Sequence, residues 1–314
     1  MTNPHFLALD GGGTGCRAII CGPDGNEISR VAGGGANLTS DFEAAARNIR
    51  DTIMAACREA GLDEAAISAS IAVLGVAGAE VGDSALRLSA QLPFAMSQVV
   101  SDQDITITGV LGQNDGTLAQ IGTGSFFVTQ CDTRTRRAGG HGFILGDECS
   151  GGWLGREVLR ATLRAYDGTA ASSLLTNAIM AEFDDDPHKI VLFARDASAA
   201  AFAGYAPRLF SAAQDGDVIA SAIINQAVHD LERIVAIIES EDAEAENSGA
   251  ENTGAENKRK GATPPLFLCG GVGERFIPLV GENFRDRIAV PDGDGISGAL
   301  IMARNLYKTG QDHG

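Results

Sequence analysis

The stretch that decides the fold is LALDGGGTGCRAII, residues 7–20. An apolar run leads into Asp10, a glycine-rich turn follows, and a second apolar run begins at Arg17. We interpret the two runs as strands joined by a tight turn, with a carboxylate where the first strand ends. Glycines let the main chain approach a ligand closely and adopt positive φ. The stretch therefore predicts a hairpin whose turn contacts a ligand through its backbone.

Length and composition set the class of protein. The 314 residues exceed what one hydrophobic core usually supports, so we expect two domains. Hydrophobic residues make up 44% of the chain and charged residues 21%, as in ordinary soluble globular proteins. No run approaches the ~18 consecutive apolar residues of a membrane-spanning helix, and no signal peptide is visible. We therefore expect a cytoplasmic protein.

Charge and cysteine content argue against further classes. Twenty-four basic and 41 acidic residues give a net charge of −17, which disfavours nucleic acid and anionic membranes as partners because phosphate binding needs basic patches. The six cysteines include no CxxC pair, and no histidine stands at metal-ligand spacing from them. We expect buried thiols rather than a metal site of soft ligands.

Strands alternate with helices in the first third of the chain, which is typical of an α/β domain. Apolar runs at 70–78 and 97–102 predict strands, and the second of them ends in a carboxylate. Helical spacing predicts a helix over 40–61, with Ser40 and Glu43 as a capping box and Gly61 as its end.

The opening pattern then restarts. LAQIGTGSFFVT, residues 118–129, repeats the layout of strand, glycine turn and strand, 111 residues after the first copy, and predicts a duplicated nucleotide-binding half. Helices are expected up to about residue 240, followed by a third glycine cluster, LFLCGGVGERF at 266–276. A closing helix is expected from Ile296 to about Tyr307.

These repeats predict the domain bounds. The first domain comprises residues 1–117 together with the closing helix at about 296–314, and the second comprises residues 118–295. Residues 239–262 lack apolar anchors and repeat GAEN, so we expect a solvated, low-complexity acidic insert in the second domain.

Three designs of phosphate-binding loop compete for the opening turn. A Walker loop needs GxxxxGK followed by Ser or Thr, and the chain contains no such string. Gly13, Gly15 and Ala18 match the dinucleotide pattern GxGxxA, but a strand follows instead of the helix that this pattern requires. The third design is a hairpin turn that offers backbone N–H groups to phosphate oxygens, with Thr14 as a hydroxyl donor and Asp10 holding hydrated Mg²⁺. We favour this hairpin.

Five motifs together resemble one family. They are DGGGT at 10–14, the strand ending in Asp102, IGTGS at 121–125, GGxGxxxGDE at 139–148 and CGGVG at 269–273. In order and spacing they resemble the BadF/BcrA-type ATPases and N-acetylglucosamine kinases of the actin-like ATPase and hexokinase superfamily. The tail VPDGDGISGALIMAR resembles bacterial glucosamine kinases, whereas the GDE form departs from their SDQ form. The resemblance implies an α/β protein of two ribonuclease-H-like domains, with an interdomain cleft for ATP and an amino sugar.

The resemblance also implies roles for single residues. Asp102 would be the general base that accepts the proton of the sugar hydroxyl, although an aspartate in this position can instead cap a following helix, as can Asp104. Asp10 would hold Mg²⁺ through water. The sugar would contact Asp102 as well as Asn37, Gly124, Ser125, Asp147 and Glu148, and ATP would contact Gly11, Gly12, Gly13, Thr14, Gly122, Thr123, Gly124, Gly270, Gly271 and Gly273.

We therefore predict an ATP- and Mg²⁺-dependent kinase that phosphorylates the 6-hydroxyl of glucosamine or N-acetylglucosamine, with a muramic acid and a homodimer left open. One rival is a dehydratase-activating ATPase, which would need cysteines placed to share an iron–sulfur cluster across a dimer. The other rival is a sugar-sensing repressor, which would normally carry a basic helix-turn-helix. The sequence displays neither feature.

Overall fold

The computed structural model describes residues 4–131, 134–240 and 263–312. The chain forms two compact units: unit 1 comprises Met1–Gln113 and Pro291–Gly314, and unit 2 comprises Asn114–Val290. The predicted domain boundary after residue 117 falls inside a strand of unit 2. The chain was predicted to return to the first domain at about residue 296, which lies just after the start of a helix of unit 1. Most of the predicted acidic insert lies outside the described residues.

Unit 1 is built on a sheet with strand order β3-β2-β1-β4-β5. Its strands are β1 (Phe6–Gly11), β2 (Cys16–Cys21), β3 (Glu27–Gly33), β4 (Ile71–Val76) and β5 (Met96–Val100). The first three strands form an antiparallel meander, and β4 and β5 join it in parallel to β1. The predicted opening hairpin is confirmed.

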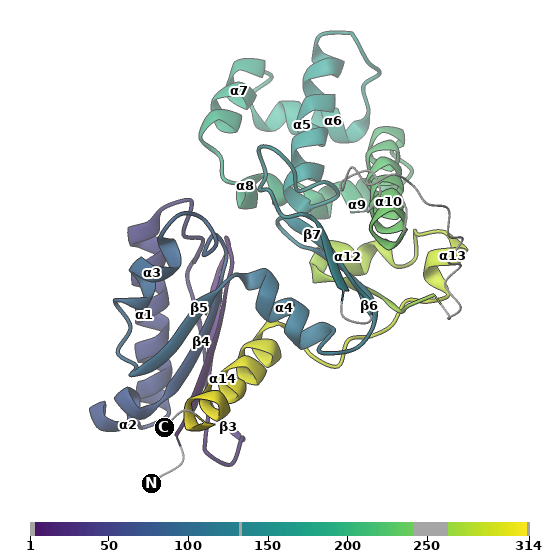
Figure 1. Ribbon diagram of the computed structural model, residues 1–314. Helices are drawn as coiled ribbons and strands as arrows, with labels where there is room; N and C mark the ends of the chain where they lie inside the picture. Colours follow the sequence, from purple (N-terminus) through teal and green to yellow (C-terminus); the bar gives the residue numbers. More distant parts are fainter. Residues whose placement is uncertain (1–3, 132–133, 241–262, 313–314) are drawn as a thin grey trace. The chain divides into compact units, whose positions relative to one another are not determined.

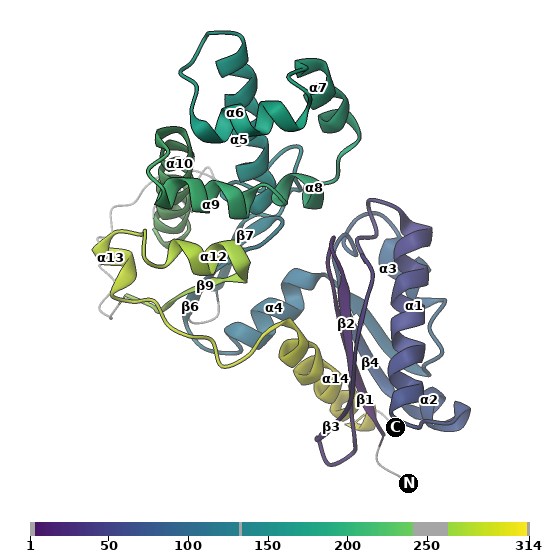
Figure 2. The same ribbon diagram turned by 180° about the vertical axis from the view of Figure 1, so that it is seen from behind.

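Helices cover both faces of this sheet (Figures 1 and 2). Alternate residues of β1 point to opposite faces, so that Leu9 packs with Ile49 of α1 whereas Ala8 belongs to the cluster of α4 and α14. The first face carries α1 (Phe42–Glu59), α2 (Glu64–Ala69) and α3 (Ser84–Ser89), and the second carries α4 (Asp102–Val110) and α14 (Gly295–Asp312).

Two local predictions for unit 1 are wrong at the helix starts. The N-cap of α1 is Asp41, whose carboxylate accepts the Ala44 N–H at 3.0 Å, so the Ser40 and Glu43 capping box does not form. Strand β5 ends at Val100, and Asp102 is already the first residue of α4. The end of α1 is as predicted, since Gly61 takes a φ of 68° just beyond it.

Unit 2 is built on a second sheet with strand order β8-β7-β6-β9. Its strands are β6 (Gly116–Ile121), β7 (Ser125–Cys131), β8 (Arg134–Gly139) and β9 (Leu266–Cys269). Strands β6, β7 and β8 form an antiparallel meander, as β1, β2 and β3 do in unit 1. Strand β9 pairs in parallel with β6, just as β4 pairs in parallel with β1. The two sheets thus repeat the same topology, as the restart of the sequence pattern predicted.

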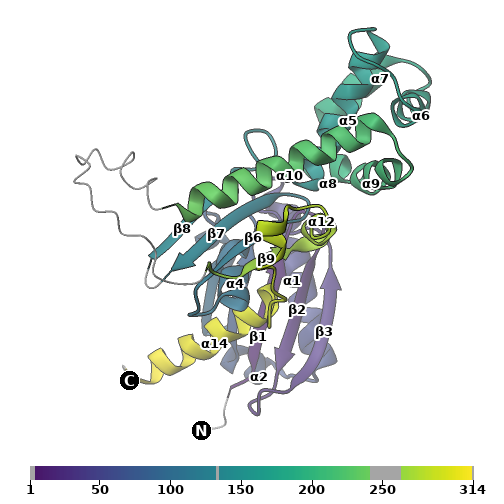
Figure 3. The ribbon, with the colours of Figure 1, turned by 90° about the vertical axis from the view of Figure 1, so that its right-hand side faces the viewer.

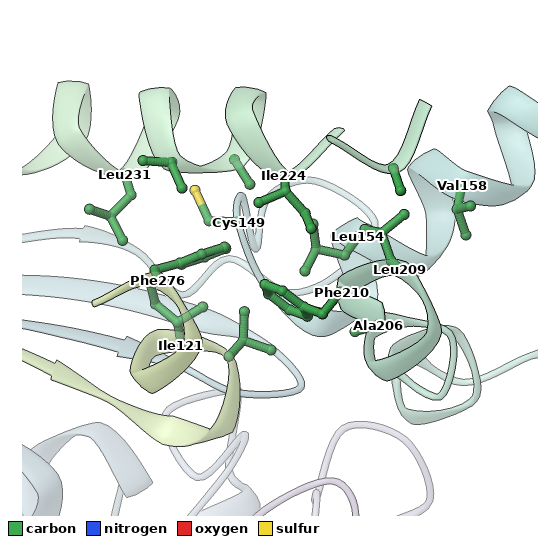
Figure 4. Packing of buried hydrophobic residues seen from close by; sticks show 14 of the residues in the cluster. Ile121, Cys149, Leu154, Val158, Ala206, Leu209, Phe210, Ile224, Leu231 and Phe276 are labelled. Atoms are coloured by element: carbon green, nitrogen blue, oxygen red, sulfur yellow. The ribbon is translucent and has the colours of Figure 1, made fainter. Parts of the chain in front are cut away.

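A helical layer packs on the second sheet. In Figure 3, α10 runs over β7 and β8. Side chains from α5, α9, α10 and α12 pack with Ile121 of β6 in one apolar cluster (Figure 4). In the described part of unit 2 the helices are α5 (Gly151–Tyr166), α6 (Leu174–Glu182), α7 (Pro187–Asp196), α8 (Ala199–Ala203), α9 (Ala206–Gln214), α10 (Val218–Glu239), α12 (Gly270–Phe276) and α13 (Glu282–Arg285).

The first residue of the predicted insert is not solvated. Glu239 ends α10, and its carboxylate accepts hydrogen bonds from Arg287, at 2.6 Å, and from the Thr117 hydroxyl. The side chains of Glu239 and Arg287 are only 12% and 11% exposed. A buried ion pair therefore fixes the end of α10. Among the described residues, no helix combines the length and apolar character needed to cross a membrane.

Candidate functional site

The first glycine turn joins β1 to β2 and keeps several donors available. Gly11 pairs with Cys16, and within the turn the Gly12 N–H donates to the Gly15 carbonyl at 2.9 Å. Among the described residues no acceptor is recorded for the N–H groups of Gly13, Thr14 and Gly15. A Cβ on Gly12 or Gly13 would meet nothing within 4 Å. The turn therefore has the open space and the donors that a phosphate group requires.

This geometry changes the reason for glycine in the turn. We expected positive φ values here, but neither Gly12 nor Gly13 has one. What glycine provides is the absence of a side chain, which lets another group come close to the backbone.

Asp10, the last side chain before the turn, is held by an arginine. The Arg17 Nη2 donates to Asp10 Oδ2 at 2.8 Å, and the two residues face each other across the β1–β2 ladder. The Asp10 side chain is 24% exposed. Arg17 also lies 3.9 Å from Asp294 Oδ2, at the start of α14. Sequence reasoning missed Arg17, although the hairpin register of a short turn places it opposite Asp10.

Asp102 lies in the first turn of α4 and is not its cap. Ser101 is the N-cap, and its hydroxyl accepts the Asp104 N–H at 3.2 Å, so neither aspartate takes the capping role that we considered. Burial, together with the negative charges of Asp10 and Glu80, raises the pKa of Asp102 to about 7. A carboxyl group with that pKa can exchange a proton near neutral pH, as a general base must.

Two further loops of unit 1 contribute polar groups. Asn37 Oδ1 accepts the Thr39 N–H at 2.9 Å and the Thr39 hydroxyl at 2.7 Å, so this oxygen stabilises its own turn. The Asn37 amide group is left as a donor for a ligand. Glu80 follows β4, is exposed, and was not singled out from the sequence. Its charge acts on Asp102.

The second glycine turn, Gly122–Gly124, joins β6 to β7 in unit 2. Ile121 pairs with Ser125, and the Gly122 N–H donates to the Gly124 carbonyl at 2.9 Å. The turn is supported by the first residues of α5, because the N–H groups of Gly151 and Gly152 donate to its carbonyls at 2.8 and 3.0 Å. A Cβ on Gly122 would meet nothing within 4 Å, as at Gly12.

Asp147 connects this turn to the loop before α5. Its carboxylate accepts the N–H groups of Ser125 and Gly142, which lower its pKa, but burial raises the pKa by more. Asp147 adopts a φ of 58° and is 7% exposed as a residue. The Ser125 hydroxyl donates to the Glu148 carbonyl at 2.6 Å. A carboxylate offers about four acceptor positions, so Asp147 can accept from a ligand as well.

The third cluster opens α12. Gly270 has a φ of 84°, and a Cβ there would lie 2.5 Å from the Ile121 carbonyl oxygen, so this position requires glycine. A Cβ on Gly271 would meet nothing within 4 Å, whereas Gly273 packs against β9 and β6. The predicted transition from strand to helix at this cluster is confirmed.

The donor set fits a hydrated magnesium ion rather than a metal enclosed by protein ligands. Within the described ranges, no three His, Cys, Asp or Glu residues gather into a metal-binding group. Asp10 offers one partly exposed carboxylate beside the open glycine turn. Mg²⁺ usually keeps several waters and binds through one or two carboxylates together with substrate phosphates.

The fold defines the class of protein. The chain has two ribonuclease-H-like units, and each begins with a hairpin whose two strands are joined by a glycine turn. This is the architecture of actin-like ATPases. The chain belongs to the BadF/BadG/BcrA/BcrD ATPase family, whose sequence profile matches residues 7–303. The family resemblance stated from the motifs is thereby confirmed.

Individual relatives are sugar kinases. The chain is 27% identical to the glucosamine kinase GspK of Vibrio cholerae, over 98% of this chain and 99% of that protein. It is 24% identical to the N-acetylmuramic acid/N-acetylglucosamine kinase of Clostridium acetobutylicum, over 72% of this chain and 76% of that protein. A crystal structure of a proposed N-acetylglucosamine kinase from Chromobacterium violaceum matches with a TM-score of 0.81 and 30% identity, covering 96% of this chain and 99% of that chain.

Proposed function

We propose that this protein is a cytoplasmic, ATP-dependent kinase that phosphorylates the 6-hydroxyl of glucosamine or N-acetylglucosamine. The observation that carries the proposal is Asp102, a carboxyl group with a pKa of about 7 in the same unit as an open glycine turn. Full-length similarity to a glucosamine kinase supports an amino-sugar substrate.

Asp102 is the proposed general base. The oxygen of the sugar 6-hydroxyl attacks the γ-phosphorus, the bond from that phosphorus to the bridging oxygen breaks, and ADP leaves. The hydroxyl proton passes to the Asp102 carboxylate. A positioned base contributes typically ~10²–10⁴-fold to such a transfer, and the rest comes from alignment and charge neutralisation.

The glycine turns are proposed to hold ATP. In unit 1, the N–H groups of Gly13 and Thr14 would donate to phosphate oxygens, and Gly12 would leave room for them. Gly11 is also a proposed contact, but packing already requires glycine there, because a Cβ would lie 2.9 Å from the Ala36 Cβ. The other proposed ATP contacts are Gly122, Thr123, Gly124, Gly270, Gly271 and Gly273. Asp10 would hold Mg²⁺ through a water molecule, and the bound ion would neutralise charge on the phosphates.

The polar residues singled out from the sequence are the proposed sugar contacts. Asn37 in unit 1 can donate through its amide, and Asp147 and Glu148 in unit 2 can accept from hydroxyl groups. Gly124 and Ser125 complete the proposed set. The Ser125 hydroxyl already donates to the Glu148 carbonyl, so its contact with the sugar would be made as an acceptor.

The rival role as a dehydratase activator has less support. Its iron–sulfur cluster would need cysteines at a surface shared by two subunits. Four of the six cysteines, Cys16, Cys21, Cys57 and Cys149, are instead buried in the cores of their units. The rival role as a sugar-sensing repressor is disfavoured by the net charge of −17, because DNA binding needs basic patches.

A coupled assay of ADP release over glucosamine, N-acetylglucosamine, N-acetylmuramic acid and glucose tests the proposal. We expect turnover with at least one amino sugar, phosphorylation at the 6-hydroxyl by NMR, and a loss of kcat of at least ~10²-fold in Asp102→Asn with sugar binding kept. Asp104→Asn, in the same helical turn, is the matched control and should stay close to wild type. ADP release that ignores the sugar, or equal turnover by the Asp102 variant, would refute the proposal.

A further inference from the structure

The ion pair between Arg17 and Asp10 has no part in the function proposed so far. Arg17 Nη2 lies 2.8 Å from Asp10 Oδ2 and 3.9 Å from Asp294 Oδ2, so one guanidinium group lies close to two carboxylates from separate segments. The Arg17 side chain is 50% exposed. Arginine suits this arrangement because its planar head presents five N–H donors in a fixed geometry.

Asp294 is itself fixed by the start of α14. Its Oδ1 accepts the Ser297 N–H at 3.0 Å and the Ser297 hydroxyl at 2.7 Å, and the Asp294 N–H donates back to the Ser297 oxygen at 2.8 Å. These reciprocal bonds involve Asp294 Oδ1, whereas Asp294 Oδ2 is the oxygen that faces Arg17. Asp294 is therefore held in place beside the guanidinium group, at ion-pair rather than hydrogen-bond distance.

The next residue brings α14 against Asp10. A Cβ on Gly295 would lie 3.3 Å from both Asp10 Cγ and Oδ2, closer than most real Cβ contacts, so glycine lets the helix start beside the carboxylate. Asp10 is thus confined by Arg17 on its own hairpin and by α14. Among the described residues no donor is recorded for Asp10 Oδ1. That oxygen is available to a water molecule of a hydrated metal ion.

We propose that Arg17 is a positioning residue for the magnesium–nucleotide complex: by holding Asp10 Oδ2, and braced by Asp294, it presents Asp10 Oδ1 beside the first glycine turn. The inference rests on the proposed function in one respect, that the ligand of this turn is magnesium-bound ATP. Arg17 acts through Asp10.

The size of the effect follows from the exposure of the pair. Exposed ion pairs contribute typically 0.2–1 kcal/mol, which corresponds to about 1.4- to 5-fold in affinity. Because two carboxylates share Arg17, we expect the upper part of this range. Arg17→Met should weaken binding of the magnesium–nucleotide complex about 3- to 5-fold. Arg17→Lys keeps the charge but loses the planar head, and should lie between wild type and Arg17→Met.

The test is isothermal titration calorimetry with a non-hydrolysable ATP analogue, in excess Mg²⁺ and in EDTA. Arg17→Met should raise Kd in Mg²⁺ and change it less than 1.5-fold in EDTA, because the role of Arg17 is to prepare Asp10 for the ion. Steady-state kinetics should show a raised KM for MgATP, with kcat and the sugar KM within about twofold of wild type.

Two further variants make the test specific. Asp294→Asn removes the second carboxylate while keeping a residue equally suited to cap α14. We expect this variant to raise the Kd of the magnesium–nucleotide complex about twofold. It also tests the proposal if Arg17→Met does not fold. Arg160→Met is the matched control, since Arg160 is 54% exposed and pairs with Glu157 at the same 2.8 Å, but on α5 of unit 2.

Each outcome separates this inference from the proposed function. An unchanged Kd in Arg17→Met and Asp294→Asn, tighter binding in Arg17→Met, or an equal loss in EDTA would overturn the role of Arg17. Failure of the wild-type protein to bind the analogue in Mg²⁺ would overturn the inference and the proposed function together. Binding by wild type with no sugar-dependent turnover would refute the sugar kinase alone.

Discussion

Lowering the pH from 8 to 6 should reduce kcat/KM for the sugar about tenfold. The proposed base works only when Asp102 is ionised, and burial together with the charges of Asp10 and Glu80 raises the pKa of Asp102 to about 7. A group with that pKa is about 0.9 ionised at pH 8 and about 0.1 at pH 6. An aspartate with the ordinary pKa of about 3.9 would remain ionised throughout this range, and the rate would not change.

A single substitution should move the profile in a defined direction. Glu80→Gln removes a negative charge that raises the Asp102 pKa, so the acid midpoint of kcat/KM should shift to lower pH while the plateau above pH 8 is kept. Glu59→Gln is the matched control, because Glu59 is an exposed carboxylate of the same unit that does not act on Asp102.

The assay is a series of initial rates of ADP release between pH 5.5 and 8.5 at constant ionic strength. Circular dichroism at each pH verifies that the protein stays folded. A profile that is flat between pH 6 and 8 would refute the assignment of the raised pKa to the catalytic base. So would an acid limb that survives unchanged in the residual activity of Asp102→Asn.

Three further predictions concern stability and the glycine turns. The folded pKa of Asp102, about 7, exceeds the ordinary ~3.9, so Asp102 destabilises the fold progressively as the pH rises from about 4 to 7. Urea unfolding should therefore find Asp102→Asn more stable than wild type at pH 8, by at most about 4 kcal/mol. At pH 4 this difference in stability should be gone. Gly12→Ala should leave the unfolding midpoint unchanged, since its Cβ meets nothing within 4 Å, yet weaken ATP binding in calorimetry by filling the space beside the turn. Gly270→Ala should lower the free energy of unfolding by about 1–3 kcal/mol, because φ is 84° and a carbonyl oxygen lies 2.5 Å from the new Cβ, whereas Gly271→Ala should be close to neutral; equal unfolding midpoints for these two variants would contradict the account.

Local patterns determined where the strands and glycine turns lie. The apolar runs on either side of Asp10 and of Gly122 predicted both hairpins, because a strand pairing across a short turn depends on residues that are neighbours in the chain. The end of α1 at Gly61 could be predicted for the same reason, since only the local backbone decides it.

Local sequence patterns did not determine which of several adjacent residues would cap a helix. Ser40, Asp41 and Ser101 are all good N-caps by type, and the sequence did not reveal that Asp41 and Ser101 would serve. Their differences are small local energies, and the packing of each helix against its sheet decides where its first turn begins.

Only the tertiary structure decided the chemistry of the candidate site residues. The pKa of Asp102 depends on its burial at the start of α4 and on charges from β1 and the loop after β4. The partners of Asp10 include α14, which begins 285 residues later in the chain. Residue types and spacing determined which groups could act, whereas burial and the pairing of distant segments set their charge and orientation, because Coulomb interactions and desolvation depend on distance in space rather than on separation along the chain.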